Sequence, residues 1–303
     1  MNDPGTGWLG RGFGVALATP FPPAGAVDER ALASLVRHVV AGGADFLVAL
    51  GSTGEASTLG DDERERVVAV VEKHKGAAAL VVGTGSPSTR QAAAWTRRAA
   101  DRGADAALVT APSYVKPTQS GVVAHFVAVA DAAPALPLIA YNVPSRTGVN
   151  VLPATARRLL ELPSVVALKE SSGDLVQIAR IAAELPAHRA LLAGDDALLL
   201  PTMAVGGTGV VSVAGNVAPA AMRALLDAVL DGDLPRARAR HVALMPLFDA
   251  LCLEPNPIPV KAALAIAGFG DPTPRLPLLP AAEATRAAIQ RALHDLRGAE
   301  SHA

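Results

Sequence analysis

Residues 165–174 read VVALKESSGD, an apolar run followed at once by a polar one. The run Val165–Leu168 shows no alternation of apolar and polar residues, which indicates a strand covered on both faces. The polar stretch that begins at Glu170 opens the loop that follows this strand. Lys169 stands at the boundary, so we expect its stem to lie in the core and its amine to face a cavity.

Apolar runs of the same kind recur along the chain, with starts roughly 20 to 35 residues apart. They are Val15–Ala18, Phe46–Leu50, Ala79–Val82, Ala106–Val109, Pro137–Ala140, Val165–Leu168, Ala190–Leu192 and Gly209–Val213. The stretches between them have helical patterns that often begin with Asp, Ser or Pro, namely 28–41, 61–74, 88–102, 119–132, 153–162 and 174–183. Eight buried strands that alternate with helices predict an α/β fold, a (β/α)8 TIM barrel. A doubly wound sheet is the alternative, but it seldom needs eight such evenly spaced units.

The strand pattern ends near Gly232, and helical patterns follow at 234–253, 258–267 and 281–296. We therefore predict a catalytic barrel over residues 1–232 and a small C-terminal helical domain over residues 233–303, packed together because no low-complexity linker separates them. The uncharged stretch 197–222 contains Pro201 and four glycines. This composition favours a helix end, a buried strand and a loop over a membrane span.

Composition and motifs argue against several classes of function. The formal net charge is −1, so no electrostatic attraction to nucleic acid or to an anionic membrane is expected. Cys252 is the only cysteine, which excludes intramolecular disulfides and cysteine-based zinc sites. No signal-peptide pattern is visible, and we expect a cytoplasmic protein. The histidines are scattered, and the phosphate-binding loop and the G-x-S-x-G motif are absent, so zinc chemistry, phosphoryl transfer and serine hydrolysis lose support.

Lys169 is the one lysine, among five, that is predicted at a strand end. Burial disfavours the ammonium form of a lysine, so a neutral amine becomes available to attack a ketone and form an imine. The chain has only two tyrosines, Tyr114 and Tyr141, and both follow predicted strands. A tyrosine there can relay protons to an imine, whereas the simpler alternative is a core ring with a satisfied hydroxyl.

Other strand ends also carry polar groups. The stretch 51–55 (GSTGE) follows the second strand, and its amides and hydroxyls suit a carboxylate, although an ordinary tight turn is equally well supported. Arg146 could clamp a carboxylate, but a solvated loop arginine is the simpler interpretation. Asp195 or Asp196, after the seventh strand, is interpreted as the N-cap of the next helix.

Eight motifs occur in a specific order along the chain. They are GSTGEAST at 51–58, APSYVKPTQ at 111–119, YNVPSRTG at 141–148, LKESSGD at 168–174, AGDD at 193–196, VVSVAGNVAP at 210–219, EPNPIPVK at 254–261 and RLPLLP at 275–280. In this order the chain resembles the dihydrodipicolinate synthase family, within the pyruvate-dependent class I aldolases that also include N-acetylneuraminate lyase. The resemblance runs from about Phe13 to Pro280. It implies a barrel with a helical C-terminal domain, commonly assembled as a homotetramer (a dimer of dimers).

The resemblance also implies a reaction. Pyruvate would condense with L-aspartate 4-semialdehyde to give 4-hydroxy-tetrahydrodipicolinate, the first committed step of lysine and diaminopimelate biosynthesis. No cofactor or metal is implied, because a covalent imine between Lys169 and pyruvate carries the chemistry. Tyr141 would donate and accept protons at the imine. Ser52 and Tyr114 would complete a proton relay, with Tyr114 contributed across a subunit interface.

Four further residues match binding positions of the family. Thr53 would bind the pyruvate carboxylate, and Arg146 would hold the carboxylate of the semialdehyde. Gly194 and Val211 would line the pocket.

The chain departs from the family pattern at two points. Ser52 replaces the usual threonine, and this variant is common in the lyase branch. An aldolase or dehydratase acting on a sugar acid or another aldehyde therefore remains an alternative, as does a non-catalytic pyruvate-binding homologue. Arg146 and the stretch 254–261 favour the synthase. The positions that match the family's lysine-feedback pocket read Asp61, Arg64, Pro87, Gln91 and Ser113, so we predict weak or absent inhibition by lysine.

Overall fold

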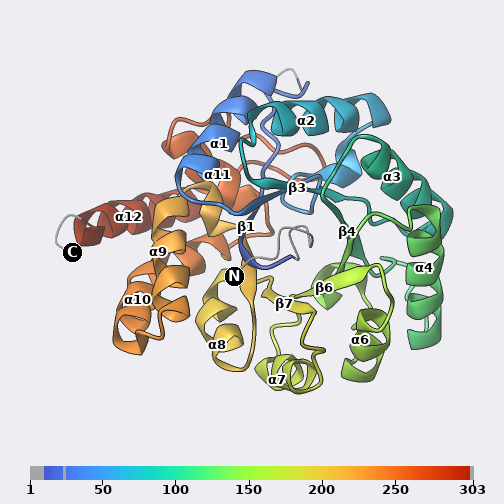
Figure 1. Cartoon of the computed structure of the whole chain (residues 1–303). Coiled ribbons are helices and arrows are strands. Elements are labelled where there is room, and N and C mark those ends of the chain that lie inside the picture. Colours follow the sequence, from blue (N-terminus) through green and yellow to red (C-terminus); the bar gives the residue numbers. More distant parts are fainter. Residues whose placement is uncertain (1–9, 23–24, 301–303) are drawn as a thin grey trace. The chain divides into compact units, whose positions relative to one another are not determined.

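The structure is a computed structural model that describes residues 10–22 and 25–300. In this part of the chain eight strands follow one another around a closed barrel in sequence order (Figure 1). They are β1 Gly12–Ala16, β2 Phe46–Ala49, β3 Ala79–Gly83, β4 Ala106–Thr110, β5 Leu138–Asn142, β6 Val165–Glu170, β7 Ala190–Ala193 and β8 Gly209–Ser212. The predicted (β/α)8 barrel is confirmed.

Helices connect the strands and continue after the last one. They are α1 Glu29–Ala41, α2 Asp61–His74, α3 Thr89–Asp101, α4 Gln119–Ala132, α5 Pro144–Thr147, α6 Pro153–Leu160, α7 Leu175–Ala183, α8 Leu199–Ala204, α9 Pro219–Leu230, α10 Leu234–Leu251, α11 Ile258–Ile266 and α12 Glu283–Glu300. Several begin at the polar residues expected from the sequence. Asp28 caps α1 by accepting from the N–H of Ala31, and Asp174 caps α7 in the same way.

Strand boundaries differ from the predicted ones where glycine or buried polar residues extend a strand. β1 begins at Gly12 rather than Val15, and a Cβ at Gly14 would lie 2.1 Å from a ring carbon of Phe46, so only glycine fits there. β6 continues to Glu170, and all six of its residues are buried. The apolar runs therefore located the strands, but they missed the ends of β1 and β6 and extended one residue past β2 and β8.

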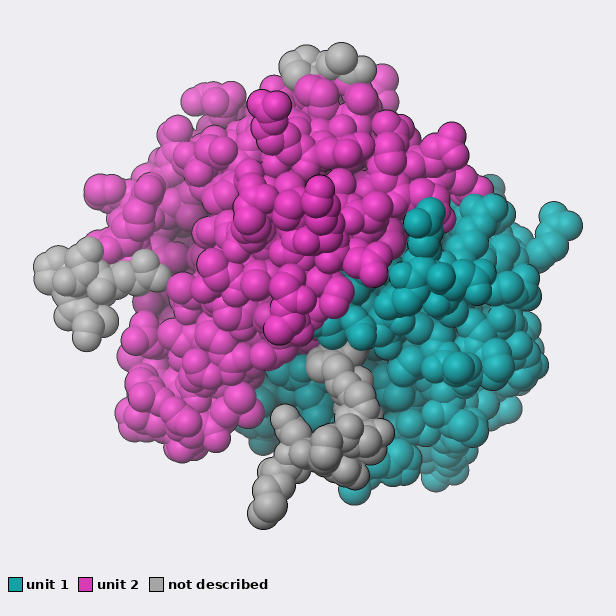
Figure 2. All heavy atoms as spheres, turned by 45° about the horizontal axis from the view of Figure 1, so that its top comes forward, with its two compact units in different colours: residues 1–12, 79–211 teal, residues 13–78, 212–303 magenta. Residues whose placement is uncertain are grey.

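The chain packs as two compact units, which Figure 2 colours separately. One contains Met1–Gly12 and Ala79–Val211, and the other contains Phe13–Ala78 and Ser212–Ala303. In the second unit α10 packs on α9 and α12, and α1 packs on α2. The helices that follow residue 232 thus share a unit with early barrel elements. The predicted boundary between two domains after residue 232 stays a prediction.

None of the helices in the described part of the chain combines the length and the apolar composition that a bilayer crossing requires.

Candidate active site

Lys169 lies near the carboxyl end of β6, where only 4% of it is exposed. Its strand neighbours are Tyr141 of β5 on one side and Leu192 of β7 on the other. The Nζ atom of Lys169 lies 4.3 Å from the centroid of the Tyr141 ring. The amine and the phenol that the sequence singled out are therefore in contact. Both residues lie on the strands themselves and not in the loops after them.

Gly194, directly after β7, leaves the space that the lysine side chain fills. A Cβ at this position would lie 2.9 Å from Cε of Lys169 and 1.8 Å from Oγ of Ser171. The Gly194 N–H donates to the carbonyl of Glu170 at 2.8 Å, which fixes its backbone against β6. A larger residue would displace Lys169, so Gly194 is part of the same site. Val211 lies on β8 and is fully buried.

Asp195 contributes a buried carboxyl group near the lysine. Burial raises the pKa of this carboxyl, and the positive charge of Lys169 opposes the shift. Asp195 stands at the N-cap position of the short 3-10 helix Asp196–Leu198, as predicted, but its side chain does not cap that helix. The helix α8 begins after Leu198. Asp195 is therefore a buried acid close enough to Lys169 for the lysine's charge to lower the pKa of its carboxyl.

A buried hydrogen-bond network holds the strand ends beside Lys169. The Glu170 carboxylate accepts from Nδ2 of Asn142 at 2.9 Å, from the N–H of Ser172 at 2.8 Å and from Nε2 of Gln177 at 3.3 Å. Burial raises the pKa of Glu170, and these hydrogen bonds oppose the shift. The network joins β5, β6 and the first turn of α7, so it fixes the backbone on both sides of the lysine. Sequence analysis missed Glu170 and Asn142; their only signal was their position directly after Lys169 and Tyr141.

Arg146 lies on the short helix α5, and Tyr114 lies in the loop after β4, which is hydrogen-bonded to that helix. Arg146 is exposed on α5. The N–H of Tyr114 donates to the carbonyl of Thr147 at 3.1 Å. Tyr114 has a φ of 69° and Lys116 a φ of 46°, a left-handed backbone that non-glycine residues seldom adopt. The Tyr114 side chain is exposed, with 90% of the residue accessible, so its ring does not pack on Lys169 of this chain.

The loop after β2, in the other unit, presents Ser52 and Thr53. Thr53 is buried, and its Oγ1 accepts from Nδ2 of Asn256 at 2.9 Å. Oγ1 of Thr19 donates to the carbonyl of Gly54 at 2.8 Å, which fixes the turn from beneath. The backbone of residues 51–55 therefore forms the tight turn that was one of the two interpretations. The same turn also fixes the position of the Thr53 hydroxyl group. Ser52 is half-buried.

A buried ion pair anchors the same loop to the C-terminal segment. Nζ of Lys261 donates to Oε1 of Glu55 at 2.6 Å, and each side chain is 2% exposed. The second carboxylate oxygen accepts from the N–H of Arg275 at 2.8 Å. Burial lowers the pKa of Lys261, while the hydrogen bond to Glu55 opposes the shift. Sequence analysis missed this pair and Asn256, although an isolated lysine inside the apolar helix α11 was a signal that it needs a partner.

Comparisons with known proteins identify relatives over nearly the whole chain. The model of the dihydrodipicolinate synthetase family matches residues 10–296. The 4-hydroxy-tetrahydrodipicolinate synthase of Thermomicrobium roseum is 50% identical over 285 residues, which cover 93% of each chain. The structure of the enzyme from Cyanidioschyzon merolae with lysine bound has a TM-score of 0.92 at 38% identity and covers 95% of this chain and 99% of its own. The chloride-inhibited enzyme of Acinetobacter baumannii complexed with pyruvate has a TM-score of 0.92 at 40% identity, with the same coverage.

Proposed function

The chain belongs to the dihydrodipicolinate synthetase family, and on that basis we propose that it condenses pyruvate with L-aspartate 4-semialdehyde to 4-hydroxy-tetrahydrodipicolinate. This makes it a lyase of lysine and diaminopimelate biosynthesis. The observation that carries the proposal is the buried amine of Lys169 held 4.3 Å above the ring of Tyr141. An amine shielded from water beside a phenol has what imine chemistry requires, a nucleophile and a group that moves protons.

The reaction begins when Nζ of Lys169 attacks the ketone carbon of pyruvate. Loss of water leaves an imine, with Tyr141 as the group that donates and accepts the protons. Removal of a methyl proton converts the imine to an enamine, and its carbon forms the new bond to the aldehyde carbon of the semialdehyde. The amino group of the semialdehyde then attacks the imine carbon, and ring closure releases the lysine. The proposal needs no metal or cofactor in any of these steps.

The loop after β2 is proposed to bind pyruvate and to continue the proton relay. Asn256 donates to Oγ1 of Thr53, so the Thr53 hydroxyl proton is directed to another acceptor, and the pyruvate carboxylate is the acceptor we assign. Ser52 supplies a hydroxyl group to the relay, as threonine does in most of the family. Gly194 and Val211 are proposed to line the pocket. Gly194 is supported by its distance to Lys169, which allows no side chain.

Tyr114 is proposed to act in a neighbouring subunit of a homotetramer. Its exposed ring, left-handed backbone and hydrogen bond to Thr147 support this role, because an anchored loop that projects a phenol into solvent is arranged for contact with another chain. Arg146 follows β5 on the short helix α5, to which the backbone of Tyr114 is hydrogen-bonded. We assign it the carboxylate of the semialdehyde, which a guanidinium group can bind through two parallel hydrogen bonds. A cytoplasmic location is proposed with this function.

Borohydride reduction tests the imine directly. With pyruvate present, the reduced adduct should add its mass to the peptide that contains Lys169 and not to the one that contains Lys261, the other buried lysine. Lys169→Ala should abolish both adduct and turnover while far-UV circular dichroism stays unchanged. An adduct that still forms in this variant, or on Lys261, would contradict the assignment.

A panel of aldehydes separates the synthase from its alternatives. Turnover with pyruvate should be fastest by far with L-aspartate 4-semialdehyde. Faster turnover with a sugar-acid aldehyde would favour another aldolase or dehydratase, which the Ser52 substitution keeps as the second candidate. An imine without turnover of any aldehyde would indicate a pyruvate-binding homologue.

A further inference from the structure

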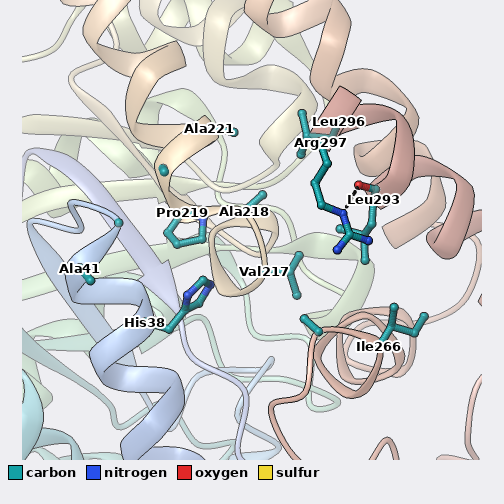
Figure 3. Close-up of a pocket in the computed structure, with 13 residues that line it drawn as sticks. His38, Ala41, Val217, Ala218, Pro219, Ala221, Ile266, Leu293, Leu296 and Arg297 are labelled. Atoms are coloured by element: carbon teal, nitrogen blue, oxygen red, sulfur yellow. Dashed lines mark hydrogen bonds between the residues drawn. The ribbon is translucent and has the colours of Figure 1, made fainter. Parts of the chain in front are cut away.

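Two features of the described chain have no part in the reaction steps given above. One is a pocket of about 400 Å³ in the second unit, with walls from α1, the start of α9, α11 and α12 (Figure 3). These walls are mainly apolar and do not specify an occupant. The other is the outer half of the hydrogen-bond network around Glu170, which lies in the first unit and reaches the segment that carries Arg146. The role of this outer half follows from its contacts.

Asn150 is the centre of the outer half of the network. Its Oδ1 accepts from Nδ2 of Asn142 at 2.8 Å and from Nε2 of Gln177 at 3.1 Å. Its Nδ2 donates to Oε1 of Gln177 at 2.8 Å, so these two amide groups form a reciprocal pair. Nε2 of Gln119 donates to the carbonyl of Asn150 at 2.8 Å. One half-buried residue thus joins β5, α7 and the start of α4.

The carboxylate of Glu170 sets the direction of the hydrogen bonds in this network. A carboxylate only accepts, so Asn142 and Gln177 must each turn an N–H towards it. The second hydrogen of each amide nitrogen then points to Asn150, which presents its oxygen to both. Its own nitrogen is left to donate to the Gln177 oxygen. An asparagine in this orientation satisfies all of these groups, which a hydrocarbon side chain cannot do.

The segment 143–152, which contains Asn150, also carries Arg146. It leaves β5 through α5 and ends where α6 begins. The helix α5 is a single turn without a side-chain cap, so it has little stability of its own. The N–H of Val151 donates to Oδ1 of Asn142 at 2.9 Å, which fixes the backbone next to Asn150 as well. The position of Arg146 therefore depends on two anchors, β5 before it and Asn150 after it.

The loop after β4 rests on the same segment. Gly148 ends α5 with a φ of 74°, and the alkyl stem of Lys116 covers it, with Cε 3.0 Å from the place that a Cβ would take. The N–H of Tyr114 donates to the carbonyl of Thr147 at 3.1 Å. A shift of the segment would therefore move the backbone support of Tyr114 together with Arg146.

We propose that Asn150 is a positioning residue for the second substrate. It holds the segment 143–152 so that Arg146 meets the carboxylate of the semialdehyde, an inference that rests on the proposed function. The step with pyruvate does not depend on it, because the hydrogen bonds of Glu170 to β5 and α7 remain when the Asn150 side chain is removed. Asn150 thus acts on the substrate that Arg146 holds and not on the one bound to Lys169.

Steady-state kinetics of Asn150→Ala tests this difference between the substrates. KM for L-aspartate 4-semialdehyde should rise about tenfold, the effect of about one lost hydrogen bond to a bound group. KM for pyruvate and the borohydride adduct on Lys169 should stay unchanged. Gln119→Ala keeps the buried side chains but removes the outer bonds to the same segment, and it should act in the same direction. Thr208→Val is the control, because it removes two hydrogen bonds to Leu191 at the amino ends of the strands, and both KM values should stay unchanged.

Hydrogen exchange tests the anchor without any substrate. Amides in the segment 143–152 should exchange faster in Asn150→Ala than in the wild-type chain, because the segment has lost one of its two anchors. Thr208→Val should leave their exchange unchanged. If the segment exchanges equally fast in the wild-type chain and in Asn150→Ala, Asn150 is no anchor and the inference is overturned, whatever happens to the proposed reaction.

A double variant shows whether Asn150 acts through Arg146. In an Arg146→Ala background, Asn150→Ala should cause no further rise in KM for the semialdehyde. A further tenfold rise, or equal rises for both substrates in the single variant, overturns the inference and leaves the proposed reaction standing. If Arg146→Ala alone leaves KM for the semialdehyde unchanged, the assignment of Arg146 to this substrate is wrong, and the inference is overturned with it.

Discussion

Replacing Lys261 by methionine should lower the free energy of unfolding by about 3–5 kcal/mol, because it leaves the buried Glu55 carboxylate without its cation. The charged atoms lie 2.6 Å apart, and both side chains are 2% exposed. At that distance an effective dielectric constant of about 20 gives a gross attraction of about 6 kcal/mol. The cost of removing both charges from water offsets much of this attraction while the pair is intact. The variant loses the attraction but keeps the cost of the buried carboxylate.

The double variant Glu55→Gln/Lys261→Met separates the ion pair from the packing. It removes both charges, so it should be more stable than Lys261→Met alone. Methionine fills the space of the lysine stem in both variants, so the packing at position 261 is the same. Urea unfolding followed by circular dichroism measures each free energy. The exposed pair of Arg157 and Glu161, 3.5 Å apart, is the control, and Arg157→Met should change stability by less than about 0.5 kcal/mol. A loss below about 1 kcal/mol for Lys261→Met, or a double variant that is less stable than the single one, would refute the reasoning.

Four further outcomes follow from the site and its surroundings. Asn256→Ala should raise KM for pyruvate several-fold, because it releases the Thr53 hydroxyl; unchanged steady-state kinetics would remove Asn256 from the site. Arg146→Ala should weaken the semialdehyde interaction by about 2 kcal/mol, the lower end for a desolvated charge pair since this arginine is exposed, and leave the borohydride adduct intact; equal losses for both substrates would make Arg146 structural. Burial lowers the pKa of His125 from 6.5 to about 4, so the unfolded chain binds more protons between those values. The stability that the neutral ring contributes is then complete above pH 6.5 and is lost as the pH falls through 4. In urea titrations from pH 4 to 7.5, His125→Gln should make the free energy of unfolding depend less on pH. Lysine should inhibit weakly or not at all, because Arg64 in the matching pocket is buried and donates to the carbonyl of Ala56; sub-millimolar inhibition in a steady-state assay would contradict this.

The sequence predicted the barrel because its strands are buried on both faces, so each one leaves an uninterrupted apolar run. Helix starts were equally predictable where a local side chain closes the first turn, as Asp28 and Asp174 do. Both signals depend only on residues close together in the chain. The position of Lys169 at the end of such a run needed no further information.

The lone lysine in the apolar helix α11 indicated that a partner was needed, but no local pattern identified that partner. Glu55 and Lys261 are 206 positions apart, and nothing near either one indicates the other. Asp195 shows the same limit in a different form. An aspartate before a helix has the local pattern of an N-cap, and only the packing of β6 beside β7 places it under the influence of Lys169. The electrostatic interaction between residues on neighbouring strands therefore could not be predicted from the sequence and is visible only in the structure.

Two buried lysines make burial alone an insufficient criterion for the nucleophile. Lys261 is 2% exposed, yet its Nζ is bonded to a carboxylate 2.6 Å away, which stabilises the ammonium form and occupies the group that would react. Lys169 is as deeply buried but has a phenol ring below it and makes no hydrogen bond or ion pair with the residues that the structure describes. Its interaction with Asp195 is a Coulombic one that lowers the pKa of that carboxyl. An amine that is shielded from water and not bound to an acid is available to attack an incoming keto acid. The two lysines are buried to a similar extent, so the ion pair with Glu55 is what distinguishes them. We therefore assign the nucleophile to Lys169 on β6 and a structural role to Lys261 on α11.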